Sequence, residues 1–439
     1  MATKEKPADR VYALLVGEEG VRFCRDIPES QCHPQPGNFL RQVAAQSLSK
    51  TGDVLADPKV VLPWLLGAVG APLFLVGFLV PIRESLALLP QVLVGSVIRR
   101  FARRKGFWVV SSLIEGICII AMGALALGGL RGAAAGWAIV ALLVLFSIAR
   151  GVASIAAKDT LGKTVSKGKR GRVSGYAATV SGLIASLVGL YLVLGPEVGT
   201  SDSLLYAIVM AAGASWLLAA LVFWTIAERP GATEGGRGLG DLIREQTHLL
   251  FKDAELRKFL LTRTLLLSTA LLGPVYVSLA QQRVGDELDA LGWLVLASGL
   301  AGFISASLWG ALADRSSRLT MALAALLAAL LGAGVLLSLY IDLAWSRSIL
   351  FFAVVLFFLN VSHAGVRIGR KTQVVDMAGA DRKAEYVALS NTVIGILLLI
   401  LGAVNGLLLE LGLEVALSVL SFLALLGGAA ALTMKNVQA

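Results

Sequence analysis

The sequence predicts an all-α integral membrane protein with twelve transmembrane helices in two six-helix bundles. Three observations support this fold class: an apolar composition, long apolar runs, and a short motif that occurs twice about half a chain apart. Of the 439 residues, 56% are hydrophobic and 15% are charged, and the mean hydropathy is +0.78. Soluble domains carry about 25% charged residues, so the composition excludes that class.

A transmembrane helix needs roughly 20 apolar residues. The apolar stretch 60–98 is too long for one helix, and Pro72 and Pro81 interrupt it. We therefore predict a first span at 39–66, with a polar first half, and a second at 72–96. Ten more runs complete the twelve spans, at about 107–129, 133–157, 173–195, 203–227, 259–282, 289–312, 318–342, 347–369, 386–409 and 412–434.

Basic residues are concentrated in alternate loops. Five lie within 99–105 and five within 163–172, whereas the loop between them contains only Arg131. Loops rich in lysine and arginine face the cytoplasm, so we expect both termini there and an even number of spans. This rule explains the net charge of +10 without nucleic-acid binding. We expect a multi-pass protein of a cell membrane, the bacterial cytoplasmic membrane.

Polar segments divide the chain into four parts. We expect a cytoplasmic extension, a first bundle, a glycine-rich cytoplasmic loop and a second bundle, at 1–38, 39–227, 228–258 and 259–439. The three cysteines give no disulfide framework, and we expect reduced thiols at Cys24 and Cys32. We expect no metal and no cofactor.

A short polar motif occurs in both halves of the chain. In the second half it reads Gly-x-x-x-Asp-Arg-x-x-Arg, and a related string lies 215 residues earlier. The echo between 157–160 and 369–372 has nearly the same offset, which predicts a duplicated unit. The motif residues are Gly95, Arg99 and Arg100 in the first copy and Gly310, Asp314, Arg315 and Arg318 in the second.

These strings resemble the signature loop that follows the second helix of each half in the major facilitator superfamily of secondary transporters. The second copy has Ser317 in place of the family's second glycine, and the first copy has Arg99 in place of its aspartate. The resemblance implies two bundles that rock about a midplane site, a cavity lined by helices one, four, seven and ten, and a cytoplasmic latch at Asp314 and Arg315. The stretch 79–91 also resembles a bacterial subgroup, for which we assign no substrate.

Polar side chains within the spans are candidates for the solute and ion pathway. A charge near mid-bilayer costs about 2.5–3.5 kcal/mol on insertion scales, so it usually faces a cavity or a partner. In the first span, three charged residues share one helical stripe with Gln46. The candidates are Lys50, Asp53, Asp57, Arg83, Glu84, Glu115, Arg150, Asn360, His363 and Arg367.

Two adjacent charges in the second span predict contacts between helices. Arg83 and Glu84 project about 100° apart on a helix, so each needs a partner elsewhere. We expect Arg83 to pair with Asp53 or Asp57. We expect Glu84 to pair with Lys50 or Arg150. The alternative to a transport role is an ion-pair network that is purely structural.

The predicted function is secondary active transport of a small solute. Arg150, His363 and Arg367 have no acidic partner on their own helices, which favours an anionic or zwitterionic solute. Proton coupling is a further hypothesis, with Asp53, Asp57, Glu84 and Glu115 as candidate carriers. Arg150 also resembles an arginine of the family's fourth helix, which the resemblance links to proton transfer.

Two other functions of the same fold stay open. One is a lipid or lysolipid flippase. The other is a drug/proton efflux pump, although the fifth span lacks that group's glycine-proline signature. We expect no enzyme, because neither H-E-x-x-H nor G-x-S-x-G is present. The expected partners are a small solute, protons and membrane lipids, and the expected state is a monomer.

Overall fold

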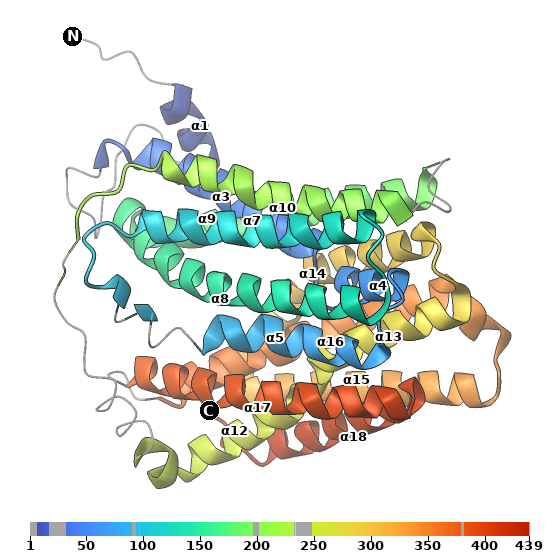
Figure 1. The fold of residues 1–439 in the computed structure, drawn as a ribbon. Coiled ribbons are helices and arrows are strands. Elements are labelled where there is room, and N and C mark those ends of the chain that lie inside the picture. Colours follow the sequence, from blue (N-terminus) through green and yellow to red (C-terminus); the bar gives the residue numbers. More distant parts are fainter. Residues whose placement is uncertain are drawn as a thin grey trace.

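The computed structural model describes residues 7–16, 32–89, 94–95, 97–195, 202–231, 233, 248–378 and 382–438. Over these residues the chain is helical, and its long helices lie side by side (Figure 1). The C-terminal end lies at the same end of the helices as α1 (Pro7–Val16). We refer to this end as the terminal end and to the other as the far end.

Each half of the chain contributes six spans. The first half contains α3 (Gln35–Leu55) with α4 (Val61–Ala68), the short helix η1 (Leu73–Leu75) with α5 (Val76–Leu88), α7 (Lys105–Leu127), α8 (Gly132–Thr164), α9 (Arg170–Leu194) and α10 (Asp202–Trp224). The second half contains α12 (Ala254–Leu266) with α13 (Ser268–Val284), α14 (Leu288–Arg315), α15 (Ser317–Tyr340), α16 (Ile349–Asp376), α17 (Lys383–Leu411) and α18 (Leu413–Leu432). This arrangement confirms the predicted fold of two six-helix bundles.

Ten spans of the described chain are long and apolar enough to cross a membrane by themselves. The other two are α3 with α4 and η1 with α5. α3 carries many buried polar side chains, among them Asn38, Gln42 and Ser49, and α5 has only 13 residues. The polar side chains of α3 have partners on other segments of the first bundle: the amide of Asn38 donates to the carbonyl oxygen of Ala227 at 3.1 Å, and the amide of Gln42 donates to the hydroxyl of Thr164 at 3.4 Å.

The first span is broken at its centre. α3 ends at Leu55, and the carbonyl oxygen of Asp57 accepts the N–H groups of Val61 and Leu62, both at 3.0 Å, to start α4. The carboxylate of Asp57 also accepts the N–H of Lys59 at 2.7 Å. Pro58 has no N–H to continue the helix. The prediction of one helix over 39–66 is therefore wrong, and the break places two charged residues inside the protein.

The two bundles repeat one packing scheme. α7 packs on α8 and α10, and in the second half α15 packs on α16 and α18. α7 begins at Lys105 and α15 at Ser317, which are 212 residues apart. This is the offset that the repeated sequence strings predict, and it supports a duplicated unit.

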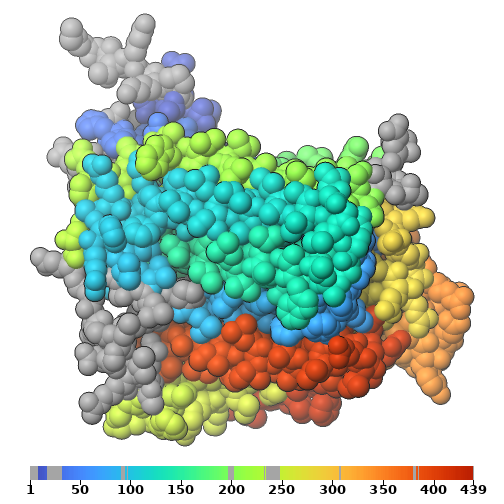
Figure 2. Space-filling model, viewed as in Figure 1, coloured from blue at the N-terminus to red at the C-terminus, as the bar shows by residue number. Residues whose placement is uncertain are grey.

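The bundles meet along two pairs of helices, α9 with α14 and α5 with α17. Figure 2 shows α17 against α5 at this boundary. A Cβ added to Gly77 would lie 2.5 Å from the backbone nitrogen of Gly406, and one added to Gly292 would lie 2.7 Å from Cβ of Leu192. Glycine is thus required for the close approach of both pairs.

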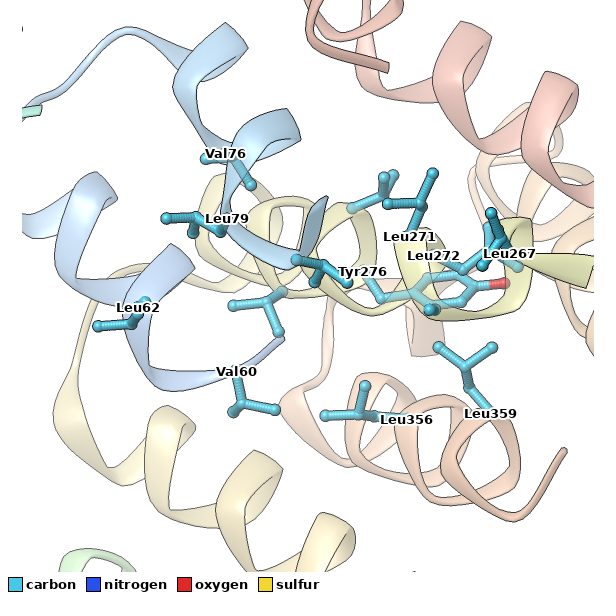
Figure 3. Close-up of a cluster of buried hydrophobic side chains, with 14 of the residues drawn as sticks. Val60, Leu62, Val76, Leu79, Leu267, Leu271, Leu272, Tyr276, Leu356 and Leu359 are labelled. Carbon is cyan, nitrogen blue, oxygen red and sulfur yellow. The ribbon is translucent and has the colours of Figure 1, made fainter. Parts of the chain in front are cut away.

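Apolar side chains fill the middle of the boundary (Figure 3). Val60 and Leu79 of the first half meet Leu271, Tyr276 and Leu356 of the second half, and all are buried. At the far end, the side-chain amide of Gln281 donates to the carbonyl oxygen of Trp64 at 3.2 Å. These contacts join the bundles beside and beyond the polar interior.

The oxidation state of one cysteine differs from the predicted reduced thiol. Cys118 is a free, buried thiol. Cys32 is disulfide-bonded, so the prediction of a reduced thiol is wrong for this residue. Cys24 lies outside the described residues.

Candidate functional site

A cavity of about 520 Å³ lies between the bundles. Its walls come from the break between α3 and α4, from α9 in the first bundle, and from α14 and α16 in the second. Four of the predicted pathway residues line it, together with one that we did not predict. These polar and charged residues are Asp57, Asn360, His363 and Arg367, and Lys59.

The uncharged polar groups of this cavity are held in place. The amide of Asn360 donates to the hydroxyl of Ser298 at 3.1 Å. Nδ1 of His363 lies 3.1 Å from the hydroxyl of Thr269 on α13. Neither contact neutralises a charge, so the electrostatic character of the cavity depends on its ionic residues.

Lys59 and Arg367 reach the cavity without an ion pair to any described residue. Lys59 is carried on the helix break, two residues after Asp57, and Arg367 lies near the terminal end of α16. Lys59 is half-buried and Arg367 is exposed, so both charges are accessible from the cavity. These two side chains can therefore attract an anion to the cavity.

A second, much smaller cavity of about 10 Å³ lies behind His363. Glu84 on α5 lines it from the first bundle, and Arg263 on α12 and Arg370 on α16 line it from the second. His363 belongs to the walls of both cavities. The two spaces are thus adjacent at His363, and their charged walls lie between the bundles.

Arg263 is anchored on one side only. Its guanidinium donates to the hydroxyl of Ser390, and Nη2 donates to Oδ1 of Asn391 at 3.2 Å. Its Nε is buried without a hydrogen-bond partner.

We call the whole charged region the cavity cluster. It contains four cations and two carboxylates, a formal excess of two positive charges: Lys59, Arg263, Arg367 and Arg370 with Asp57 and Glu84.

A separate ionic network lies inside the first bundle. One carboxylate oxygen of Asp53 accepts from Arg83 at 2.6 Å, and the other accepts from Arg150. Arg150 also donates to Glu115 at 3.3 Å and to the hydroxyl of Ser49 at 2.8 Å. We call Asp53, Arg83, Glu115 and Arg150 the Asp53 network. Its two cations and two carboxylates balance.

Two pairing predictions can be compared with this geometry. The pairing of Arg83 with Asp53 is confirmed. The pairing of Glu84 with Lys50 or Arg150 is wrong, because α5 directs Glu84 toward α12 and α16 while Arg83 points to α3 and α8. Lys50 instead donates to the carbonyl oxygen of Ser174 at 3.0 Å.

The expectation that Arg150 lacks an acidic partner holds only within its own helix. Two carboxylates from other helices neutralise it, Asp53 on α3 and Glu115 on α7. Arg83 is further stabilised by the ring of Phe146, whose centroid lies 4.7 Å from its guanidinium carbon. Arg150 therefore does not favour an anionic solute, whereas Arg367 has no ion pair with a described residue.

Three residues of the cavity cluster escaped the sequence analysis. Lys59 does not continue the polar stripe of the first span, whose members are three or four residues apart, because the helix is broken before it. The pair Asp57-Pro58 was the sequence signal that could have predicted this break. Arg370 lies in α16, which continues to Asp376 beyond the predicted limit at 369. Arg263 lies inside the predicted seventh span and was not singled out.

The repeated motif lies at the terminal end and is exposed. Arg99, Arg100, Asp314 and Arg315 are all solvent-accessible, and among the described residues Asp314 forms no ion pair. Arg318 donates to the carbonyl oxygen of Met434 at 3.0 Å within its own bundle. A Cβ at Gly95 or at Gly310 would meet open space. The described contacts of the motif do not cross between the bundles, so the latch stays a prediction.

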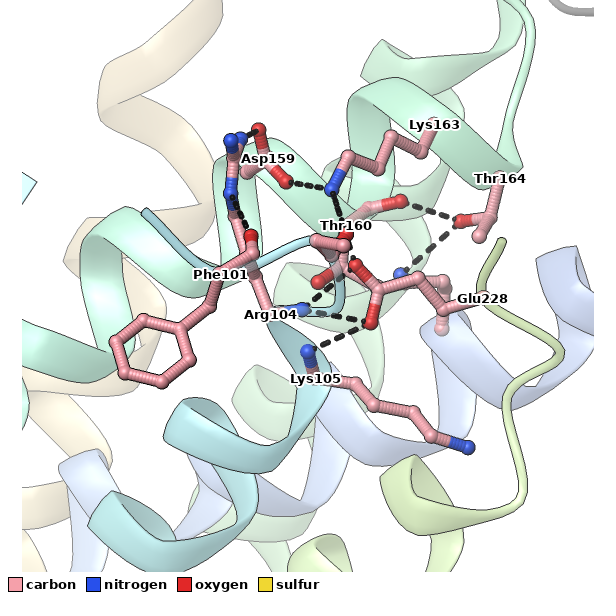
Figure 4. A network of polar contacts seen from close by, with 10 residues as sticks. Phe101, Arg104, Lys105, Asp159, Thr160, Lys163, Thr164 and Glu228 are labelled. Carbon is pink, nitrogen blue, oxygen red and sulfur yellow. Dashed lines mark hydrogen bonds and ion pairs between the residues drawn. The ribbon is translucent and has the colours of Figure 1, made fainter. Parts of the chain in front are cut away.

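Glu228 organises the terminal end of the first bundle instead (Figure 4). Its carboxylate accepts the backbone N–H groups of Arg104 and Lys105 at 2.9 and 2.7 Å, at the N-terminus of α7. Lys163 on α8 contacts both Glu228, at 3.2 Å, and Asp159, at 2.7 Å. A carboxylate at a helix N-terminus is stabilised by unpaired N–H groups and the helix dipole. This network fastens α7 to α8.

Comparison with known proteins gives structural neighbours and no sequence relatives. No protein-family model and no curated sequence matches the chain. The neighbours include a point mutant of the nucleoside transporter NupG, with a TM-score of 0.66, 11% identity, and coverage of 91% of this chain and 100% of that one.

Two further neighbours cover the chain to the same extent. A D-xylose-proton symporter aligns with a TM-score of 0.68 and 12% identity, over 91% of this chain and 98% of that one. A POT family transporter in complex with a thioalcohol-conjugated peptide aligns with a TM-score of 0.69 and 11% identity, over 93% and 98%. At these identities the likeness concerns the fold. This multi-pass membrane protein has the fold of the major facilitator superfamily, with two six-helix bundles around a central cavity.

Proposed function

We propose that this protein is a secondary active transporter that moves a small anionic or zwitterionic solute across the membrane by alternating access. The observation that carries the proposal is the cavity of about 520 Å³ between the bundles, into which Lys59 and Arg367 project without a described ionic partner. A solute with a carboxylate, sulfonate or phosphate group supplies the missing negative charge.

The contacts between bundles support access from the terminal end in this conformation. α9 runs toward the far end and α14 runs back from it, and they touch closely at Gly189 and Gly292. The cavity is lined by the adjoining segments of these helices, 178–185 of α9 and 295–305 of α14, which lie nearer the middle of each helix. Rocking of the bundles would separate the glycine contacts and open the far end.

The rest of the predicted topology belongs to the same proposal. The terminal end faces the cytoplasm of a bacterial cell, the boundaries of the parts lie at 1–38, 39–227, 228–258 and 259–439, and the protein acts as a monomer. Asp314 and Arg315 form a latch between the bundles in a state that is closed at the terminal end. In the present conformation both side chains are exposed and available for such contacts.

Proton coupling is part of the proposal. The interior carboxylates that can carry a proton are Asp53, Asp57, Glu84 and Glu115. Two of them, Asp57 and Glu84, lie in the cavity cluster, where a change of charge acts on the bound solute. Uptake or efflux that ignores an imposed pH gradient would remove this part of the proposal.

The test is a thermal-shift screen of the detergent-purified protein at pH 5.5 and 7.5. The ligands are organic anions, amino acids, sugars, cationic drugs and lysolipids, with Arg367→Met as the matched variant. A ligand at about 100-fold excess over its Kd stabilises the folded state by about 2.7 kcal/mol. We expect anions to raise the melting temperature of the wild type and to lose this effect in Arg367→Met. Stabilisation by cations or lysolipids alone would refute the anionic solute.

A further inference from the structure

We propose that a cavity at the terminal end of the second bundle binds a phosphate group, at a site separate from the solute cavity. The cavity has about 560 Å³ and lies between the start of α12, the start of α17 and the segment after α18. Its ligand is the headgroup of an anionic phospholipid or a free phosphate compound, since both present the same oxyanion. This site is additional to the proposed transport function and does not depend on the identity of the solute.

Arg382, which immediately precedes α17, is held with its terminal nitrogens free. Its Nε donates to a carboxylate oxygen of Glu385 at 3.1 Å, and its guanidinium carbon lies 5.6 Å from the centroid of the Tyr386 ring. Its Nη1 and Nη2 have no partner among the described residues. Arginine binds phosphate through two parallel N–H donors, and a guanidinium that is already oriented loses less freedom on binding.

Tyr386 is in turn fixed to α12. It is buried, and its hydroxyl donates to Oδ2 of Asp253 at 2.5 Å. The other carboxylate oxygen of Asp253 accepts the backbone N–H of Leu256 at 3.0 Å and caps α12. Both oxygens of Asp253 are thus engaged within the protein, and this chain of contacts connects Arg382 to the first turn of α12.

Two lysines complete the basic side of the cavity. Lys252 lies in the turn before α12, whose backbone is held by a hydrogen bond from Arg257 to the carbonyl oxygen of Phe251. Lys435 follows α18, and its carbonyl oxygen accepts the side-chain amide of Gln373 at 3.3 Å. Both lysine side chains are exposed, and neither ammonium group has an ion pair with a described residue.

The charges of the cavity favour an anion with several oxygen atoms. Glu255 pairs with Lys258 at 3.0 Å, and His248 also lines the cavity. A carboxylate ligand offers two oxygens, whereas a phosphate group offers at least three and can accept from a guanidinium and two ammonium groups at once. The walls carry three cations and two carboxylates, a formal excess of one positive charge: Lys252, Arg382 and Lys435 with Asp253 and Glu255.

The surroundings of the cavity favour a lipid as the source of the phosphate. Figure 1 shows that α12 starts at the terminal end of the helices. Phe251, next to Lys252, is 72% exposed, and Leu261 on α12 is 60% exposed. Exposed apolar side chains beside lysines at the end of a span are typical of the membrane interface. A headgroup bound there would hold α12, α17 and the segment after α18 together.

The experiment measures phosphate binding to the full-length protein by thermal unfolding in micelles of an uncharged detergent. The soluble probe is inorganic phosphate. The lipid probe is phosphatidic acid mixed into the micelles, with phosphatidylcholine as the zwitterionic reference. A ligand of the folded state raises the melting temperature, so a titration gives an apparent Kd for each probe.

Arg382→Gln and Lys383→Gln form a matched pair of variants. Each removes one exposed positive charge at the start of α17, but only Arg382 lines the cavity. We expect Arg382→Gln to raise the apparent Kd at least about tenfold, because it removes a charge-assisted pair of hydrogen bonds. Lys383→Gln should change the Kd by less than about threefold. An equal rise in both variants would indicate attraction to surface charge in general and would overturn the inference.

Lys435→Gln covers the case in which Arg382→Gln does not fold, because it breaks no ion pair with a described residue. It should also raise the apparent Kd above that of Lys383→Gln. Equal affinity of these two variants for the probe would overturn the inference.

The two probes identify the source of the phosphate. Binding of phosphatidic acid alone, sensitive to Arg382→Gln, supports a lipid site. Binding of inorganic phosphate with the same sensitivity supports a site that also accepts free phosphate compounds. Binding of neither probe would overturn the inference.

Arg367→Met distinguishes this site from the solute cavity. It should leave phosphate binding unchanged, because Arg367 does not line the cavity of the phosphate site. Binding that is lost in Arg367→Met and kept in Arg382→Gln would place the phosphate in the solute cavity, which would overturn the inference and support the proposed function. Phosphate binding that depends on Arg382, together with no binding of any organic anion, would support the inference and overturn only the anionic solute.

Discussion

The Asp53 network and the cavity cluster are built from the same residue types, yet their arrangement differs. In the Asp53 network two arginines and two carboxylates are in direct contact, within one bundle. In the cavity cluster four cations and two carboxylates surround two open spaces, and they come from both bundles. The first arrangement is electrically complete, whereas the second has an excess of positive charge.

Under the proposed function, the Asp53 network has a structural role and the cavity cluster binds the solute. Direct pairs between α3, α5, α7 and α8 fix the positions of these helices, and they need not change when the bundles move. Direct pairs across the boundary would have to break at each turn of a transport cycle. Charges that act across a gap avoid this cost and leave room for a solute.

The largest effect is expected from Asp53→Ala, which leaves two arginines with only Glu115 as a counter-charge. Removal of one partner from a buried ionic group costs about 3–5 kcal/mol. Because the members are up to 24% exposed, we expect about 3 kcal/mol of lost stability, measured by SDS-induced unfolding. Asp342→Ala is the control, since it removes exposed pairs with Arg347 and Arg283 that are each worth less than about 1 kcal/mol. Equal losses would contradict the structural role.

The second prediction concerns Lys59→Met, which removes one cation of the cavity cluster. A hydrogen bond to a charged group contributes about 1.5–3 kcal/mol, so anion affinity should fall by about tenfold or more. Stability should stay the same or rise, because no direct ion pair is broken and a buried charge is lost. Calorimetry and thermal unfolding of the same preparation measure both quantities. If Lys59→Met lost as much stability as Asp53→Ala, the two clusters would contribute equally to the unfolding free energy, and the difference between them would be refuted.

A pair of double-mutant cycles sharpens the comparison. Residues in contact show coupling energies of about 0.5–3 kcal/mol. We expect a value in this range for Asp53→Asn with Arg83→Gln, whose side chains are 2.6 Å apart. For Lys59→Met with Glu84→Gln, we expect a smaller coupling in the unfolding free energy. A larger coupling energy for Lys59 with Glu84 than for Asp53 with Arg83 would show that the gap in the cavity cluster does not weaken the interaction.

The smallest effects on stability are expected at the two copies of the repeated motif. Asp314 and Arg99 are exposed, so Asp314→Asn and Arg99→Glu should each change the unfolding free energy by less than about 0.5 kcal/mol. Asp314→Asn should nevertheless lower the transport rate in proteoliposomes more than Arg99→Glu does, because only the second copy keeps the acidic residue of the latch. Equal, small effects on the rate would refute unequal latches.

The sequence was sufficient for the fold because the responsible signals are local and repeated. Apolar runs of helical length, the sorting of basic loops and the duplicated strings each depend on neighbouring residues. The exception is the first span, where Asp57-Pro58 interrupts the hydrogen bonding of a helix that its apolar content alone would not end.

Partners across helices were harder to predict. The pairing of Arg83 with Asp53 or Asp57 was expected because adjacent charges on a helix need partners on other helices. The sequence does not give the rotation of α5, which turns Glu84 to the other bundle. Lys59 lies beyond the unpredicted break of the first span, Arg370 lies beyond the predicted end of its helix, and Arg263 lies inside the predicted seventh span. These residues matter because they face the cavities between the bundles, and tertiary packing decides which side chains do so.

The most direct test of the central claim is cysteine labelling from each side of the membrane. Thr179 lines the cavity from α9, and Thr179→Cys can be treated with a membrane-impermeant thiol reagent in sealed vesicles of known orientation. The central claim, that the cavity between the bundles is the solute's path, predicts labelling from the terminal end without ligand and a change of this access on anion binding. Labelling from neither side, or labelling that the anion leaves unchanged, would contradict it.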